Sequence, residues 1–176
     1  MGTNPFRTDV SAWIARFAPL VRQGGPVLDL ACGGGRHSRL FLDRGHPVTA
    51  LDRDMAQAQL NQGAELVEAD LENGSPWPLA DRRFAGVVVT NYLWRPLFPR
   101  ILDSLETGGV LIYETFALGN EAYGRPRNPD HLLDRGELLR LTHGLTVVAF
   151  EDGIEDGRKV VQRICALNGP GPVGLG

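Results

Sequence analysis

Asp29, Gly33 and Gly35 form the pattern D-x-x-x-G-x-G within the segment VLDLACGGG, residues 27–35. Glycine leaves the backbone bare, so a ligand can lie directly against it. The apolar run before the glycines predicts a buried strand. The glycines after it then fall at the carboxyl edge of a sheet, where open α/β sheets bind their ligands. The segment therefore predicts a ligand site at that edge.

Two acidic residues, Asp52 and Asp70, end the next two predicted strands. A carboxylate at Asp52 can accept hydrogen bonds from both hydroxyls of a ribose, and Asp70 with Leu71 can frame an adenine. The alternatives are a helix cap for Asp52 and a solvated loop acid for Asp70. A nicotinamide dinucleotide is a competing ligand, but its G-x-G-x-x-G pattern needs glycine where this chain has Ser38. The spacing therefore favours a different nucleoside ligand.

Apolar runs and breaker residues predict the elements that position these groups. Strands are predicted over residues 27–31, 47–51, 65–69, 84–90 and 110–114. Helices are predicted before residue 24, directly after Gly35, and over residues 54–61, 97–105 and 134–142. Two more strands, residues 145–151 and 159–167, are joined by a short turn and form an antiparallel hairpin. The alternation predicts an α/β fold with a mainly parallel sheet.

These features resemble the class I S-adenosylmethionine-dependent methyltransferases over nearly the whole chain. Within that class the chain is similar to the small bacterial enzymes related to tellurite-resistance methyltransferases. The resemblance implies a Rossmann-like seven-stranded sheet, mostly parallel with an antiparallel last strand, and helices on both faces. It also implies S-adenosyl-L-methionine as the cofactor and S-adenosyl-L-homocysteine as its product.

The resemblance also implies a set of cofactor-binding residues, carried over position by position. The four residues of the glycine-rich segment match the motif around the methionine part of the donor. Asp52, after the second strand, matches the ribose position, and Arg53 lies beside the adenine. Asp70 and Leu71, after the third strand, match the adenine edge. Asn91, after the fourth strand, lies beside the transferring methyl group. The residues are Asp29, Ala31, Gly33, Gly35, Asp52, Arg53, Asp70, Leu71 and Asn91.

Tyr92, Trp94 and Arg95 directly follow the fourth predicted strand, where ligands of such sheets bind. We expect at least one of them to contact the methyl acceptor; the alternative is that the aromatic rings pack at the rim. Tyr92 is also a candidate catalytic residue. The Asn-Pro-Pro-Tyr motif of amino-methylating enzymes is absent, since Asn91 is followed by Tyr92, Leu93 and Trp94. That difference argues against methylation of adenine or glutamine nitrogens.

Glu114 ends the fifth predicted strand and is either a general base or a capping acid. The segment 116–133 is rich in Gly, Pro and Asn, and a long irregular loop of this kind is usually functional. Its Tyr123, Arg125 and Arg127 are candidate substrate-binding residues, with a solvated surface as the alternative. The two arginines together are suited to holding an anionic acceptor.

The 176 residues suit one domain, which we expect over residues 1–168, with a flexible tail over residues 169–176. The formal net charge of −3 argues against a nucleic-acid partner, and no apolar run is long enough to cross a membrane. Two cysteines without metal spacing indicate a cytoplasmic protein. The four scattered histidines have no paired spacing, so no metal site is predicted.

The sequence as a whole predicts S-adenosylmethionine-dependent methyl transfer to an O, N, S or metalloid nucleophile of a small molecule. Two alternatives stay open: methylation of RNA or protein, and a module that binds the donor without catalysis. The identity of the acceptor, the use of a general base, the oligomeric state and closure of the loop 116–133 are left open by the sequence.

Overall fold

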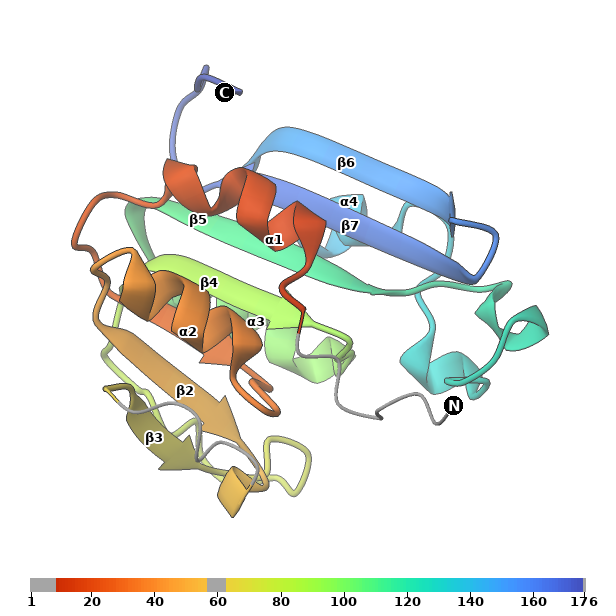
Figure 1. Ribbon diagram of the computed structural model, residues 1–176, viewed down its shortest axis with the longest axis horizontal. Coiled ribbons are helices and arrows are strands. Elements are labelled where there is room, and N and C mark those ends of the chain that lie inside the picture. Colours follow the sequence, from red (N-terminus) through yellow and green to blue (C-terminus); the bar gives the residue numbers. More distant parts are fainter. Residues whose placement is uncertain (1–8, 57–62, 176) are drawn as a thin grey trace.

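Seven strands form one sheet in the computed structural model, which describes residues 9–56 and 63–175. The strands lie in the order β3-β2-β1-β4-β5-β7-β6 (Figure 1). β1 to β5 pair in parallel, whereas β7 is antiparallel to both β5 and β6. The predicted fold, a mostly parallel sheet with an antiparallel last strand, is confirmed. The strands are β1 Val27–Leu30, β2 Val48–Asp52, β3 Glu65–Glu68, β4 Phe84–Thr90, β5 Leu105–Phe116, β6 Thr146–Glu155 and β7 Lys159–Leu167.

Helices cover both faces of the sheet (Figure 1). One face carries α1 and α2, and the other carries α3 and α4. The bounds are α1 Ala12–Phe17, α2 Arg36–Asp43, α3 Phe98–Asp103 and α4 Glu137–Leu141. Short 3-10 helices span Ala18–Leu20, Arg95–Leu97, Asn120–Ala122 and Pro129–His131.

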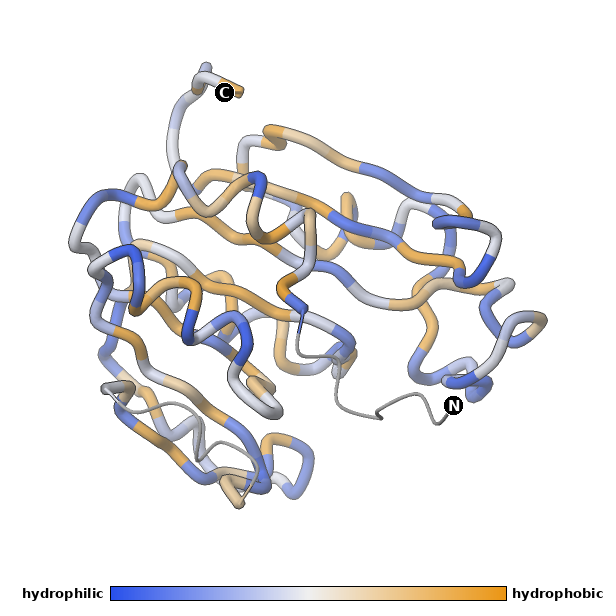
Figure 2. The backbone as a smooth tube through the Cα atoms, viewed as in Figure 1, coloured by the Kyte–Doolittle hydropathy of each residue, from blue (hydrophilic) through white to orange (hydrophobic). Residues whose placement is uncertain are grey.

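Two hydrophobic cores result from the alternation of side chains along the strands. In β5, Leu111 and Tyr113 pack against α3, while Val110 and Ile112 pack on the opposite face, under α1. All four side chains are fully or almost fully buried. Figure 2 shows the hydrophobic residues concentrated along the central strands and the hydrophilic ones in the connecting loops. Each strand of the sheet centre is therefore apolar on both faces, as expected for parallel strands covered by helices.

Several element bounds differ from the sequence prediction for local reasons. The predicted helix over residues 134–142 begins at Glu137, because Gly136 has a left-handed φ of 65°. The predicted helix over residues 97–105 ends at Asp103, because Leu105 pairs with Phe84 and so begins β5. Most of the predicted helix over residues 54–61 lies outside the described residues. Within residues 9–56 and 63–175, no helix has the length and apolar character that a membrane span requires.

Candidate functional site

The loop between β1 and α2 presents bare backbone at the carboxyl edge of the sheet. Ala31, Gly33 and Gly35 have left-handed φ angles of 55°, 52° and 79°. A Cβ atom built on Gly33 or Gly34 would meet no protein atom within 4 Å. Packing within the protein therefore does not explain the glycine at position 34, whose φ is not left-handed. The open space beside the loop fits the approach of a ligand to the backbone.

Asp52, at the end of β2, is held by two backbone N–H groups. The Gly33 N–H donates to its Oδ2 (2.8 Å), and the Asp54 N–H donates to its Oδ1 (3.1 Å). The Cys32 N–H donates to the Leu51 carbonyl (3.1 Å), so the glycine loop is tied to β2 at two points. These contacts fix the orientation of the carboxylate, and each oxygen keeps a further lone pair for a ligand hydroxyl.

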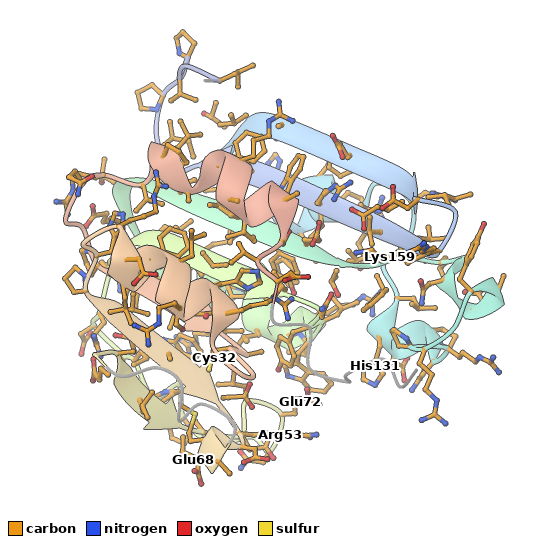
Figure 3. All side chains as sticks on the ribbon, viewed as in Figure 1. Cys32, Arg53, Glu68, Glu72, His131 and Lys159 are labelled. Carbon is orange, nitrogen blue, oxygen red and sulfur yellow. The ribbon has the colours of Figure 1, made fainter. Side chains whose placement is uncertain are left out.

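A cavity of about 510 Å³ lies at this edge of the sheet. Figure 3 shows Arg53 and Glu72, which follow β2 and β3, on one side and His131 of the loop after β5 across from them. The cavity is lined by Ala31, Leu51, Asp52, Arg53, Ala69, Asp70, Leu71, Glu72, Asn91, Tyr92, Leu93, Thr115, Phe116, Pro126 and His131. Seven predicted site residues thus share one cavity: Ala31, Asp52, Arg53, Asp70, Leu71, Asn91 and Tyr92.

Asp29, another predicted donor-site residue, lies behind the glycine loop and is only 1% exposed. Its Oδ2 accepts a hydrogen bond from the Ser38 hydroxyl (2.6 Å), which links β1 to the first turns of α2. Burial raises the pKa of this carboxyl to about 6, against the smaller opposing effect of the Ser38 hydrogen bond. The structure therefore gives Asp29 a contact that supports the loop from inside, rather than a place in the cavity wall.

Glu114 lies away from the cavity, on the face covered by α1. Its Oε1 accepts from the Ser11 hydroxyl (2.9 Å), and its Oε2 accepts from Arg163 Nη1 (2.8 Å). The side chain is 6% exposed and does not line the cavity. The structure does not bring Glu114 to the predicted reaction site, and both of its carboxylate oxygens are engaged by Ser11 and Arg163.

Tyr92 and Asn91 line the cavity directly after β4. Burial raises the pKa of the Tyr92 phenol well above its usual range, and the neighbouring Glu72 carboxylate adds to this effect. Tyr92 therefore keeps its proton at neutral pH and can donate a hydrogen bond. Asn91 has a left-handed φ of 54°, and its N–H donates to the Glu114 carbonyl (2.9 Å), which ties the end of β4 to β5.

The predicted acceptor-binding residues are dispersed. Trp94 lines a neighbouring cavity of about 440 Å³ together with Trp77, beyond the segment 70–72. Tyr123 is 43% exposed, and Arg125 and Arg127 are also exposed; none of the three lines the larger cavity.

Arg95, also a predicted acceptor-binding residue, fastens the loop 116–133 to the body of the protein. Its Nε and Nη2 donate to the two carboxylate oxygens of Glu137 (2.6 and 2.9 Å). Its Nη1 and Nη2 also donate to the carbonyls of Asp130 and Leu132 (3.0 and 2.9 Å). The guanidinium is thus engaged by protein groups, and it holds the segment that carries His131.

Eight cavity-lining residues were not predicted from the sequence: Leu51, Ala69, Glu72, Leu93, Thr115, Phe116, Pro126 and His131. Four of them belong to the end of β5 and to the loop after it. The Gly- and Pro-rich composition of that loop indicated function, but it did not indicate which side chains turn toward the sheet. In the described part of the chain, no group of three or more His, Cys, Asp or Glu side chains is arranged to hold a metal ion.

Comparison with known proteins gives a family match that includes the glycine loop and Asp52. Residues 27–109 match a family described as a methyltransferase domain. A malonyl-[acyl-carrier protein] O-methyltransferase from Pseudescherichia vulneris is 46% identical over 109 residues, 56% of this chain and 42% of that protein. A trans-aconitate 2-methyltransferase from Sinorhizobium fredii is 34% identical over 97 residues, 49% of this chain and 37% of that protein. The chain spans less than half the length of these curated relatives.

Solved structures show the same fold at low identity. TehB from Haemophilus influenzae superposes with a TM-score of 0.73 at 13% identity, covering 90% of this chain and 62% of that chain. An S-adenosylmethionine-dependent methyltransferase from Mesorhizobium loti superposes with a TM-score of 0.70 at 18% identity, covering 91% and 99% of the two chains. The resemblance to class I methyltransferases related to TehB, expected from the sequence, is confirmed.

Proposed function

Because residues 27–109 match the methyltransferase domain family, we propose that the chain transfers the methyl group of S-adenosyl-L-methionine to a small molecule. The observation that carries the proposal is the alignment of open backbone at Gly33 and Gly34 with the fixed carboxylate of Asp52. These are the groups that an extended nucleoside ligand with an amino-acid tail requires. Asp70 and Leu71, in the same cavity wall, complete the side on which its base would lie.

In this proposal the predicted donor-site residues have distinct tasks toward the donor. The backbone of the loop 31–35 lies along the methionine part, and Asp52 accepts hydrogen bonds from the ribose hydroxyls. Arg53, Asp70 and Leu71 lie around the adenine, and Asn91 lies next to the methyl group. Asp29 acts indirectly, because its bond to Ser38 holds α2 against the glycine loop.

When bound, the donor supplies a sulfonium methyl group that is already activated toward nucleophiles. The protein's own contribution is then mainly to align the two reactants, which is worth roughly 7–11 kcal/mol in well-oriented systems. Tyr92 stays protonated, so its task is hydrogen bonding rather than proton removal. Glu114 is held by Arg163 and Ser11, and we no longer propose it as the base.

Calorimetric titration of S-adenosylhomocysteine tests the donor site. We expect saturable binding, weakened by about tenfold or more in an Asp52→Ala variant, because charge-assisted hydrogen bonds contribute roughly 1.5–3 kcal/mol each. Glu68→Ala is the matched control, since Glu68 is the register partner of Asp52 on β3 but does not line the cavity. Binding of NAD in preference, or equal affinity in the Asp52→Ala variant, contradicts the proposal.

A small-molecule acceptor is favoured over RNA or protein because the cavity is walled on the acceptor side by the anchored loop 116–133. Incubation with labelled donor and a cell lysate separated by size distinguishes these classes; label on macromolecules alone would contradict the proposal. We further propose that residues 1–168 act as one domain and that the protein works in the cytoplasm, where its two free, buried cysteines stay reduced.

A further inference from the structure

The cavity is rich in negative charge. The carboxylates of Asp52, Asp70 and Glu72 line it, against the single guanidinium of Arg53 among the described lining residues. Clefts lined by one sign of charge concentrate molecules of the opposite sign and exclude those of the same sign. The donor carries a sulfonium, an ammonium and a carboxylate group, so it offsets part of this charge. An anionic acceptor would still enter a field that opposes it.

Two arginines of the described residues, Arg95 and Arg163, are bound by other groups of the protein. Arg95 is bound to Glu137 and to two backbone carbonyls. Arg163 is bound to three carboxylates, those of Glu114, Glu151 and Glu155. These contacts occupy the N–H groups with which a guanidinium would otherwise bind a carboxylate through two parallel hydrogen bonds.

The remaining two arginine candidates, Arg125 and Arg127, do not compensate for this. Both are exposed on the loop, and neither lines the cavity. The sequence-based hypothesis that the two hold an anionic acceptor therefore has no support in this arrangement.

The side of the cavity opposite the glycine loop is mostly apolar. The lining residues from the ends of β4 and β5 and from the loop after β5 include Tyr92, Leu93, Phe116 and Pro126, together with Thr115 and His131. Such walls fit a compact apolar or aromatic body. His131 lines the cavity with an imidazole, whose ring nitrogens can accept or donate a proton.

We propose that the acceptor is an amine carried on a small apolar body, and that His131 takes the proton that its ammonium form must lose. This inference rests on the proposed methyl transfer. Oxygen acids, thiols and chalcogen acceptors attack as anions, which the carboxylates of this cavity disfavour. An amine attacks as a neutral molecule and leaves as a cation, so the same carboxylates favour it before and after the reaction.

The proposed reaction is balanced within the cavity. The imidazole of His131 takes one proton from the ammonium group, which exposes the nitrogen lone pair. The lone pair forms the N–CH3 bond as the S–CH3 bond breaks, and its electrons stay on sulfur. The product is a methylated ammonium ion and neutral S-adenosylhomocysteine, and His131 returns its proton to solvent.

Matched acceptors test this inference on the full-length protein. The panel pairs amines with carboxylates of the same body, for example 2-phenylethylamine with 3-phenylpropionate. First, S-adenosylhomocysteine is titrated; absence of binding would overturn the proposed function itself. Then each acceptor is titrated into the saturated protein, and transfer of labelled methyl is measured. We expect amines to bind and to react with at least tenfold higher kcat/KM. Equal or better use of carboxylates, or no binding of any amine, would overturn the inference alone.

Two variants separate charge from shape. In Glu72→Gln, the ratio of kcat/KM for amines to kcat/KM for carboxylates is expected to fall several-fold. Glu68→Gln, at an exposed carboxylate outside the cavity, is expected to leave this ratio unchanged. His131→Gln is expected to lower amine kcat without changing S-adenosylhomocysteine affinity, and the deficit should shrink as pH rises because more amine is already neutral. His143→Gln, at an exposed histidine outside the cavity, is the control. An unchanged preference in Glu72→Gln, or a His131→Gln deficit that does not depend on pH, would contradict the proposal.

Discussion

Replacement of Arg95 by methionine tests whether this residue fastens the loop over the cavity. The substitution keeps an unbranched apolar stem and removes four hydrogen bonds. Two of them go to Glu137 (2.6 and 2.9 Å), and two go to the carbonyls of Asp130 and Leu132 (3.0 and 2.9 Å). The Glu137 side chain is 10% exposed, so its charge would be left largely buried without its partner.

The expected loss can be worked from these contacts. Removing one partner of a buried ion pair costs about 3–5 kcal/mol, because the other charge stays buried. The Arg95 side chain is itself 36% exposed, which weakens the pair through solvent screening. The Asp134 N–H also keeps its bond to Glu137 Oε2 (2.7 Å). We therefore expect Arg95→Met to lower the free energy of unfolding by about 2–4 kcal/mol.

Urea unfolding at neutral pH measures this loss, and a double-mutant cycle assigns it. Glu137→Gln removes the buried charge, so the double variant is expected to be less destabilised than the sum of the single variants by about 1–2 kcal/mol. Arg100→Met, at an exposed arginine of α3, is the control and should change stability by less than about 0.5 kcal/mol. A loss below about 0.5 kcal/mol for Arg95→Met would refute the proposed role of Arg95 in fastening the loop 116–133. Strict additivity of the losses in the single variants would refute it as well.

Three further substitutions follow from the backbone and from one buried acid. Gly34→Ala should leave the unfolding free energy within about 0.5 kcal/mol, since its Cβ meets nothing, yet weaken S-adenosylhomocysteine binding in calorimetry. Gly25→Ala should do the reverse, losing about 1–3 kcal/mol in urea unfolding, because its Cβ would lie 2.4 Å from that of Ala85. Burial raises the pKa of Asp29 from 3.8 to about 6, so between these pH values the folded state holds a proton that the unfolded chain releases. Asp29 should therefore lower the unfolding free energy by about 3 kcal/mol as pH rises through this window, and urea titrations measure this as the difference in pH dependence between the unmodified protein and Asp29→Asn. Equal effects of the two glycine substitutions, or the same pH dependence of the unfolding free energy with and without Asp29→Asn, would contradict these expectations.

The donor half of the site could be predicted from the sequence because strand order alone places it. Asp52, Asp70 and Asn91 each follow a parallel strand, and the carboxyl ends of parallel strands meet at one edge. The apolar run Phe84–Thr90 has the same bounds in the prediction and in the structure. Such positions depend on local pattern and on topology, both of which the sequence carries.

The acceptor half depends on pairings between residues far apart in the chain. Glu114 lies on the α1 face, like Val110 and Ile112, and there its partner is Arg163 of β7, 49 residues further along the chain. Arg95 points to Glu137, 42 residues further along the chain. His131 reaches the cavity because those contacts hold its loop in place. No period or motif in the sequence encodes these partners, so the sequence predicted the loop as functional without its arrangement.

The position of β7 inside the sheet governs the order in which the chain can fold. β6 is made before β7 but pairs with β7 and not with β5, so it has no neighbour in the sheet until residues 159–167 have been synthesised. The packing of α1 also depends on β7. The Trp13 indole N–H donates to the Ile164 carbonyl (3.3 Å), and the Arg163 guanidinium lies over the Trp13 ring. Contacts of such long range form slowly. Until β7 is made, the nascent chain therefore exposes the unpaired edge of β5 and part of the apolar face of α1, and β7 then completes both the sheet and the packing of α1.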